Sequence, residues 1–168
     1  MKININLSEI FYQQIKLDQH IHYNHHLSYA DVFDELKLAL AVELGELANE
    51  VRCFKFWSFK QPSAKNIILE EYVDGIHFIT SLAIAKNVKN YDQWRINVDS
   101  KQNTKKEITI LFNQLFGHVN KLNNKLNIVK WYRDYIKLGY ALGFSFDEIK
   151  TAYTKKNQIN HQRQNNNY

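Results

Sequence analysis

The sequence predicts an all-α fold, a single bundle of about six helices, and three observations support this. One proline and five glycines in 168 residues are too few for the turns of a protein built from many short strands. Apolar residues recur at helical spacing along most of the chain. Hydrophobic residues make up 45% and charged residues 23%, as in a globular protein with one core, so we expect one domain over residues 1–168.

Three helices are expected in the first half of the chain. The first runs from about Ser8, as its N-cap, to about residue 24. The second covers residues 29–51. The third covers residues 63–86 and opens just after the only proline, Pro62, which suits a helix start.

The second half contributes three more helices after a polar stretch, residues 91–103, that we expect to be a loop. The fourth and fifth helices cover residues 104–123 and 128–142. Gly143 is a natural stop, because glycine readily adopts the left-handed conformation that ends many helices.

The sixth helix begins at Ser145, because Ser145 and Glu148 have the spacing of a capping box. It is expected to end near residue 162. Residues 165–168 are rich in asparagine and are expected to fray.

No stretch approaches the roughly 20 apolar residues of a membrane span, and the N-terminus lacks the apolar core of a signal peptide. We therefore expect a cytoplasmic protein without a membrane partner. The only cysteine, Cys53, cannot form an internal disulfide and lies among apolar residues, so we interpret it as a small core residue.

The net charge of +5 raises the hypothesis of a nucleic-acid partner, but the charge is unevenly distributed. Residues 31–74 hold nine acidic and five basic residues, whereas residues 150–168 hold four basic and no acidic ones. No nucleic-acid-binding motif accompanies the charge, and lysines scattered on helix surfaces explain it more simply. We expect no nucleic-acid partner.

Acidic residues occupy unusual positions on the second and third helices. Glu43, Glu46 and Glu50 form one stripe flanked by apolar residues on both sides, and Glu71 and Asp74 lie one turn apart on a helix that is otherwise apolar. Packing the two helices together would gather Glu43, Glu46, Glu71 and Asp74, whose charges repel strongly in a poorly hydrated cleft.

A bound cation is the expected compensation, and oxygen ligands without sulfur or imidazole favour Mg²⁺, or Mn²⁺ as a substitute. One alternative is an exposed groove whose acids pair with lysines of neighbouring helices. A di-iron bundle is another alternative, but it requires Glu-x-x-His on two helices, and Asp74-x-x-His77 is the only approximation here.

The C-terminal residues, from about 156 to 168, form a basic tail that we expect to be mobile. Lys156, Asn160 and Arg163 share one helix face and could contact phosphates held at the acidic helices. The alternative is a solvated basic helix end that is favourable to its own dipole.

Four motifs together resemble the dimeric, all-α dUTP pyrophosphatases of bacteria and phages, within the all-α NTP pyrophosphatase superfamily. They are Glu43-x-x-Glu46 with Glu50, Phe54-Lys-Phe-Trp57, Glu70-Glu71-x-x-Asp74-Gly-x-His77-Phe78, and Lys156-Asn157-x-x-Asn160-x-x-Arg163-Gln164. The resemblance spans the first helix to the last residue. One departure is Asn167, which stands before the terminal Tyr168 where the family often has glycine.

The resemblance implies a homodimer that hydrolyses dUTP to dUMP and pyrophosphate, with Mg²⁺ held by Glu43, Glu46, Glu71 and Asp74. It leaves dUDP open as a second substrate. Glu43 or Glu46 would orient or deprotonate the attacking water, with Glu43 the expected base. The phosphates would be bound by Lys156, Asn160 and Arg163. The nucleoside would be bound by Gln14, Trp57, Asp74 and Phe78.

Two other functions remain open at this point. The same chemistry could act on dCTP or a noncanonical nucleotide. A protein of a different class, a non-catalytic helical protein that binds metal through these carboxylates, would release no pyrophosphate.

Overall fold

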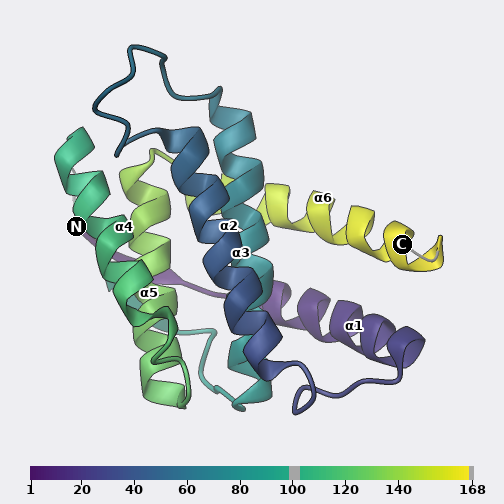
Figure 1. Cartoon of the computed structure of the whole chain (residues 1–168). Helices are drawn as coiled ribbons and strands as arrows, with labels where there is room; N and C mark the ends of the chain where they lie inside the picture. The colour runs from purple at the N-terminus through teal and green to yellow at the C-terminus, as the bar shows by residue number, and fades with distance from the viewer. Residues whose placement is uncertain (99–102, 167–168) are drawn as a thin grey trace.

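The computed structural model describes residues 1–98 and 103–166, and within them the chain folds mainly into helices (Figure 1). This confirms the all-α prediction, apart from a small two-stranded sheet. In chain order the elements are β1 (Lys2–Ile5), α1 (Ser8–His25), α2 (Phe33–Val51), α3 (Lys65–Ala85), β2 (Trp94–Asn97), α4 (Lys105–Val119), α5 (Lys125–Ala141) and α6 (Phe146–Asn165).

Helices α3 and α5 begin two residues later and three residues earlier than predicted. Two further helix starts differ from the prediction because side chains at these turns take other partners. Ser8 is the first residue of α1 and not its N-cap; the side chain of Asn6 accepts the Ser8 N–H at 2.9 Å. Helix α2 begins four residues later than expected. Asp31 accepts hydrogen bonds from the backbone N–H and the hydroxyl of Ser28, at 2.8 and 2.6 Å, and so holds the preceding residues in a turn.

The strand pair was missed by the sequence analysis, which interpreted residues 91–103 as a loop. β1 and β2 pair antiparallel, with Ile3 opposite Ile96 and Ile5 opposite Trp94. β2 alternates buried and exposed residues, but over only four residues. A period of two cannot be recognised in so short a segment, so only the pairing of distant strands reveals it.

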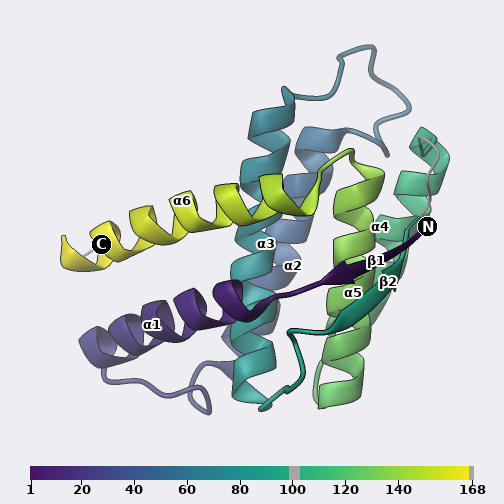
Figure 2. The same ribbon diagram turned by 180° about the vertical axis from the view of Figure 1, so that it is seen from behind.

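Helix α3 is the central element and packs against α1, α2, α5 and α6. From Tyr72 to Ala83 it is buried around most of its circumference, as its nearly continuous apolar pattern predicts. Figure 1 and Figure 2 show α1 and α6 side by side, extending away from α2, α4 and α5 on the same side of the molecule. Cys53 is a buried free thiol, in agreement with its interpretation as a core residue.

The capping box predicted at α6 is confirmed, since Ser145 and Glu148 exchange side-chain and backbone hydrogen bonds. Gly143 has a φ of +86°, a conformation that glycine adopts without strain. α6 continues to Asn165, beyond the predicted end, so residues 156–165 of the expected tail belong to this helix. The departure at Asn167 and Tyr168 lies outside the described residues.

Two stacked tyrosines join α3 to α5. The rings of Tyr72 and Tyr135 have centroids 4.7 Å apart and are nearly parallel, and each hydroxyl donates to the backbone carbonyl of the other residue, at 3.1 and 2.9 Å. Each ring lies over a glycine of the facing helix. A Cβ atom at Gly75 would meet the Tyr135 hydroxyl at 2.2 Å, and one at Gly139 would meet the Tyr72 hydroxyl at 2.6 Å.

Gly75→Ala is expected to destabilise the protein by about 2 kcal/mol, because the added methyl forces a buried ring out of its position. Alanine is the better helix former, so without this clash the change would be stabilising. Gly117→Ala in α4 is the matched control; its new methyl meets nothing within 4 Å, and a gain of up to ~1 kcal/mol is expected. Urea unfolding measures both, and equal stability of the two variants would contradict the clash.

Candidate functional site

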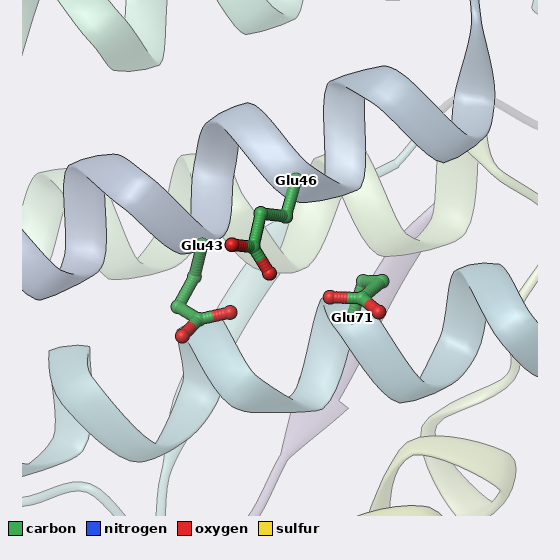
Figure 3. A group of neighbouring side chains, drawn as sticks. All are labelled: Glu43, Glu46 and Glu71. Carbon is green, nitrogen blue, oxygen red and sulfur yellow. The ribbon is translucent and has the colours of Figure 1, made fainter.

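Three glutamates from two helices point toward one another (Figure 3). Glu43 and Glu46 come from α2 and Glu71 from α3, and one carboxylate oxygen of each lies within 4.8 Å of the others. α2 and α3 form the largest helix contact in the described residues, made by the apolar residues beside the acidic stripe, such as Leu40, Leu44 and Leu47. The packing therefore places the acids along the rim of this contact.

The charges of these acids disfavour one another. Burial, and after it the charges of Asp74, Glu46 and Glu71, raise the pKa of Glu43 to about 7. Burial also raises the pKa of Glu71, again with contributions from Asp74 and Glu46. A positive charge beside Glu43 and Glu71 would therefore favour their ionised forms.

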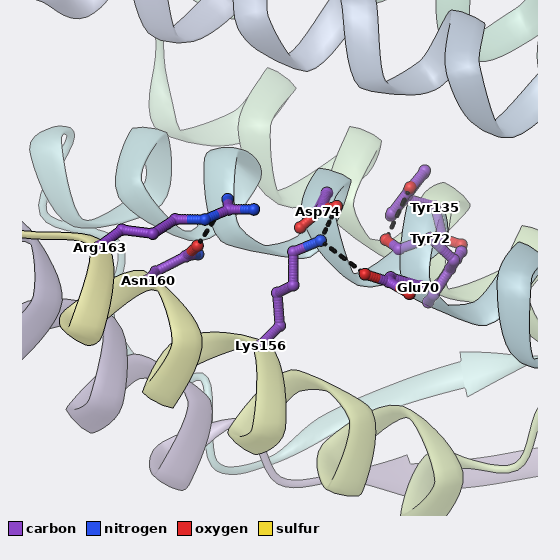
Figure 4. A network of polar contacts seen from close by, with 7 residues as sticks. All are labelled: Glu70, Tyr72, Asp74, Tyr135, Lys156, Asn160 and Arg163. Carbon is purple, nitrogen blue, oxygen red and sulfur yellow. Dashed lines mark hydrogen bonds and ion pairs between the residues drawn. The ribbon is translucent and has the colours of Figure 1, made fainter. Parts of the chain in front are cut away.

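Asp74, the fourth predicted carboxylate, forms an ion pair instead of joining the group of three. The Lys156 ammonium of α6 lies 2.8 Å from Asp74 and 3.1 Å from Glu70 (Figure 4). Burial opposes the charge on Lys156, but the hydrogen bond and charge of Asp74 outweigh it and raise the pKa of Lys156. A cation from a helix more than 80 residues away in sequence thus meets the acids of α3.

Most of the predicted site residues meet at one cavity of about 360 Å³ between α1, α2, α3 and α6. Its lining includes the three predicted phosphate-binding residues, Lys156, Asn160 and Arg163, together with Gln14, Glu43, Asp74 and Phe78. On α6, Asn160 accepts a hydrogen bond from Arg163 at 3.4 Å. Glu43 belongs both to this cavity and to the glutamate group, so the two form one continuous site.

Three predicted site residues do not line this cavity: Glu46 and Glu71, which belong to the glutamate group, and Trp57, which belongs to neither. Trp57 lies in the segment between α2 and α3, is 63% exposed, and contacts the rings of Phe54 and Phe56. A larger cavity of about 600 Å³ lies between β1, α4 and α5, and it contains neither Trp57 nor any of the predicted carboxylates.

A network of buried polar side chains from α1, α3 and α6 surrounds Gln14 in the wall of the cavity. The amide group of Gln14, 2% exposed, donates to Asp18 at 2.8 Å and to the hydroxyl of Ser81 at 3.0 Å. Its oxygen accepts from Nδ1 of His77 at 2.8 Å and from the Tyr153 hydroxyl. Burial lowers the pKa of His77 to about 3, so its ring is neutral.

Sequence reasoning did not assign a function to Asp18, His77, Ser81 or Tyr153. Asp18 lies one helical turn after Gln14, a spacing that allows the two side chains to meet. Tyr153 is 139 residues from Gln14, and no local pattern could have indicated its contact.

The family model described as dUTPase matches residues 6–168. A comparison with curated proteins finds no significant match. Within the described residues, no helix combines the length and the apolar character that spanning a membrane requires. Members of the dUTPase family generally depend on a divalent metal ion, which agrees with the acidic cluster in this chain. Because the match covers nearly the whole sequence, the chain belongs to the dUTPase family and is a nucleoside triphosphate pyrophosphohydrolase that acts on dUTP.

Proposed function

We propose that the protein binds Mg²⁺ through Glu43, Glu46, Glu71 and Asp74 and hydrolyses dUTP to dUMP and pyrophosphate at this site. The observation that supports this best is the convergence of three carboxylates beside a cavity whose facing wall carries cationic residues of α6. A negatively charged triphosphate fits between the two only when metal ions neutralise the acidic side. This argument favours a nucleotide substrate over a partner protein.

The residues present fit a hard divalent cation. The donors are carboxylate oxygens, and no histidine or cysteine joins the group within the part of the chain that the structure describes. Such a set suits Mg²⁺, with Mn²⁺ as a substitute, better than Zn²⁺. When bound, the metal supplies positive charge at the phosphate oxygens and lowers the pKa of a coordinated water.

Glu43 is the residue that we assign to the attacking water. It is half-buried and lines the cavity, whereas Glu46 is exposed and does not line it. Glu46 and Glu71 then act mainly as ligands.

Lys156, Asn160 and Arg163 are the residues that we assign to the phosphates. They lie on one face of α6 and all line the cavity. The ammonium of Lys156 is bound to Asp74 and Glu70. Phosphate oxygens in the cavity could replace these carboxylate partners, and Lys156 would then supply a positive charge to the triphosphate.

The nucleoside end is assigned to Gln14, Asp74 and Phe78, which share the cavity with the phosphate-binding residues. Phe78 is partly buried and adjoins His77 on α3, where its ring can pack against the deoxyribose. Trp57 is a nucleoside contact only across an interface with a second chain, because it does not line the cavity of its own chain.

We also propose a homodimer. Exposed apolar side chains continue from the outer face of α2 onto the following segment: Leu38, Val42, Phe56, Trp57 and Phe59. Large exposed apolar surfaces of this kind mark sites of association. A second copy of the chain is the partner that the exposed Trp57 requires.

Glu43→Gln and Glu71→Gln are each expected to lower kcat on dUTP at least a hundredfold, because each removes a ligand charge and Glu43→Gln also removes the base. Glu35→Gln, an exposed position on the same helix, is the control and should retain activity. Pyrophosphate release from dUTP, dUDP, dCTP and noncanonical nucleotides, with Mg²⁺ and after chelation by EDTA, provides the measurement. Full activity of Glu43→Gln would rule out the site, and a better substrate than dUTP would change the assigned specificity.

Lys156→Met is expected to have opposite effects on the two ligands. Binding of Mg²⁺ should strengthen, since the ammonium that competes for Asp74 is gone, while kcat/KM for dUTP should fall by a factor of roughly 100. Calorimetry measures the first effect and steady-state kinetics the second. Lys155→Met, an exposed neighbour on α6, should change neither. Weaker Mg²⁺ binding by Lys156→Met would show that the ion pair does not compete with the metal.

The double variant Leu38→Arg/Val42→Arg is expected to be a monomer at micromolar concentrations at which the wild-type protein is a dimer, because it places two charges in the proposed interface. Leu126→Arg, a change at a still more exposed apolar residue near the start of α5, should leave the dimer intact. Light scattering after size-exclusion chromatography gives the masses, and a monomeric wild type would refute the dimer.

A further inference from the structure

The orientation of the Gln14 amide is determined by one of its four partners. A side-chain amide has two ends of opposite hydrogen-bonding character, and it can turn over by rotating about its last bond. The Ser81 and Tyr153 hydroxyls can each donate or accept, and neutral His77 can carry its proton on either ring nitrogen. These three partners therefore accommodate either orientation.

Asp18 is the exception, because an ionised carboxylate only accepts. It is buried, and its oxygens receive hydrogen bonds from Tyr29 at 2.7 Å, Gln14 at 2.8 Å and Ser81 at 3.0 Å. Burial raises the pKa of Asp18, and these three hydrogen bonds oppose the rise by favouring the charged form. Turning the Gln14 amide over would place its oxygen against the carboxylate, so the NH₂ group stays on the side of Asp18.

The orientation of the Gln14 amide determines which pyrimidine base matches its hydrogen-bonding groups. Uracil offers a donor at N3 and an acceptor at O4, and cytosine offers an acceptor at N3 and a donor at N4, so the two bases present opposite patterns. An amide in one orientation matches one of these patterns, and the reversed amide matches the other. Gln14 can therefore discriminate the two pyrimidines only if it does not turn over.

We propose that Asp18 is a positioning residue that holds the Gln14 amide in the orientation that selects uracil over cytosine. The proposal rests on the proposed function, in which Gln14 contacts the base. All four hydrogen-bonding positions of the amide are occupied in this structure, so a bound base must replace two partners. Ser81 and Tyr153 are the exchangeable ones, because a hydroxyl can rotate to another partner. Asp18 and His77 remain and hold the amide.

The orientation of the Gln14 amide also determines the tautomer of His77. Because the Gln14 oxygen faces His77 Nδ1, that nitrogen must carry the proton. The other ring nitrogen, Nε2, is then a bare acceptor, and it is buried without a hydrogen-bond partner among the described residues. The Nδ1–H tautomer is thus an observable sign of the amide orientation in the protein without a ligand.

Asp18→Asn tests whether Asp18 holds the amide in one orientation. The asparagine side chain is nearly the same size as aspartate, but it can either donate a hydrogen bond to Gln14 or accept one from it. We expect the ratio of kcat/KM for dUTP to kcat/KM for dCTP to fall at least tenfold. Tyr29→Phe is the control: it removes a hydrogen bond from the same carboxylate but leaves Asp18 an acceptor, so the ratio should stay within twofold of the wild type. A merely structural role of Asp18 would lower both kcat/KM values together and leave the ratio unchanged, which would overturn the proposal.

Gln14→Ala separates this proposal from the function on which it rests. If Gln14→Ala loses the uracil preference and Asp18→Asn keeps it, only the positioning role of Asp18 is overturned. If both variants keep the preference, base recognition by Gln14 is overturned. Long-range ¹H–¹⁵N spectra of His77 in the wild-type protein give a test that does not depend on whether a variant folds. The Nδ1–H tautomer is expected, and the Nε2–H tautomer would overturn the proposed orientation.

Discussion

The contact between α3 and α5 determines where the chemistry of this protein takes place. Tyr72 and Tyr135 bind each other's backbone carbonyls through close approaches that only Gly75 and Gly139 permit. Glu71 and Asp74 adjoin Tyr72 and Gly75 in sequence, so the contact that fixes the rotation of α3 also fixes the direction of its acids. Because α3 is packed against four other helices, a shift in its rotation would change every wall of the cavity.

The distribution of charge follows from the same arrangement. A net charge of +5 is compatible with many partners, but the acids lie together on α2 and α3 and the cations that face them come from α6. Lys156 partly neutralises the acidic side through Asp74 and Glu70, and Glu43 and Glu71 retain raised pKa values. A divalent cation bound as proposed would relieve this repulsion.

Two sides of the cavity rely on different kinds of interaction. At the side that we assign to the phosphates, exposed and half-buried charges act over several ångströms and can exchange partners. At the side that we assign to the nucleoside, Gln14 is buried in a network in which every hydrogen-bonding position of its amide is occupied. Buried networks are rigid because a buried polar group without a hydrogen-bond partner costs free energy. This side is therefore suited to discriminating between bases of similar shape.

Local patterns in the sequence determined most of the fold and much of the site. Helical spacing located six helices, the Ser145 capping box located the start of α6, and the acidic stripes identified the carboxylates that the structure brings to the rim of the cavity. These features could be predicted because each depends on residues within a turn or two of one another. Only the tertiary structure decided the β1–β2 pair, the Lys156–Asp74 ion pair, the place of Trp57 outside its own cavity and the contact of Tyr153 with Gln14. Each of these depends on how distant segments pack, and the same helices in another arrangement would satisfy the same local patterns.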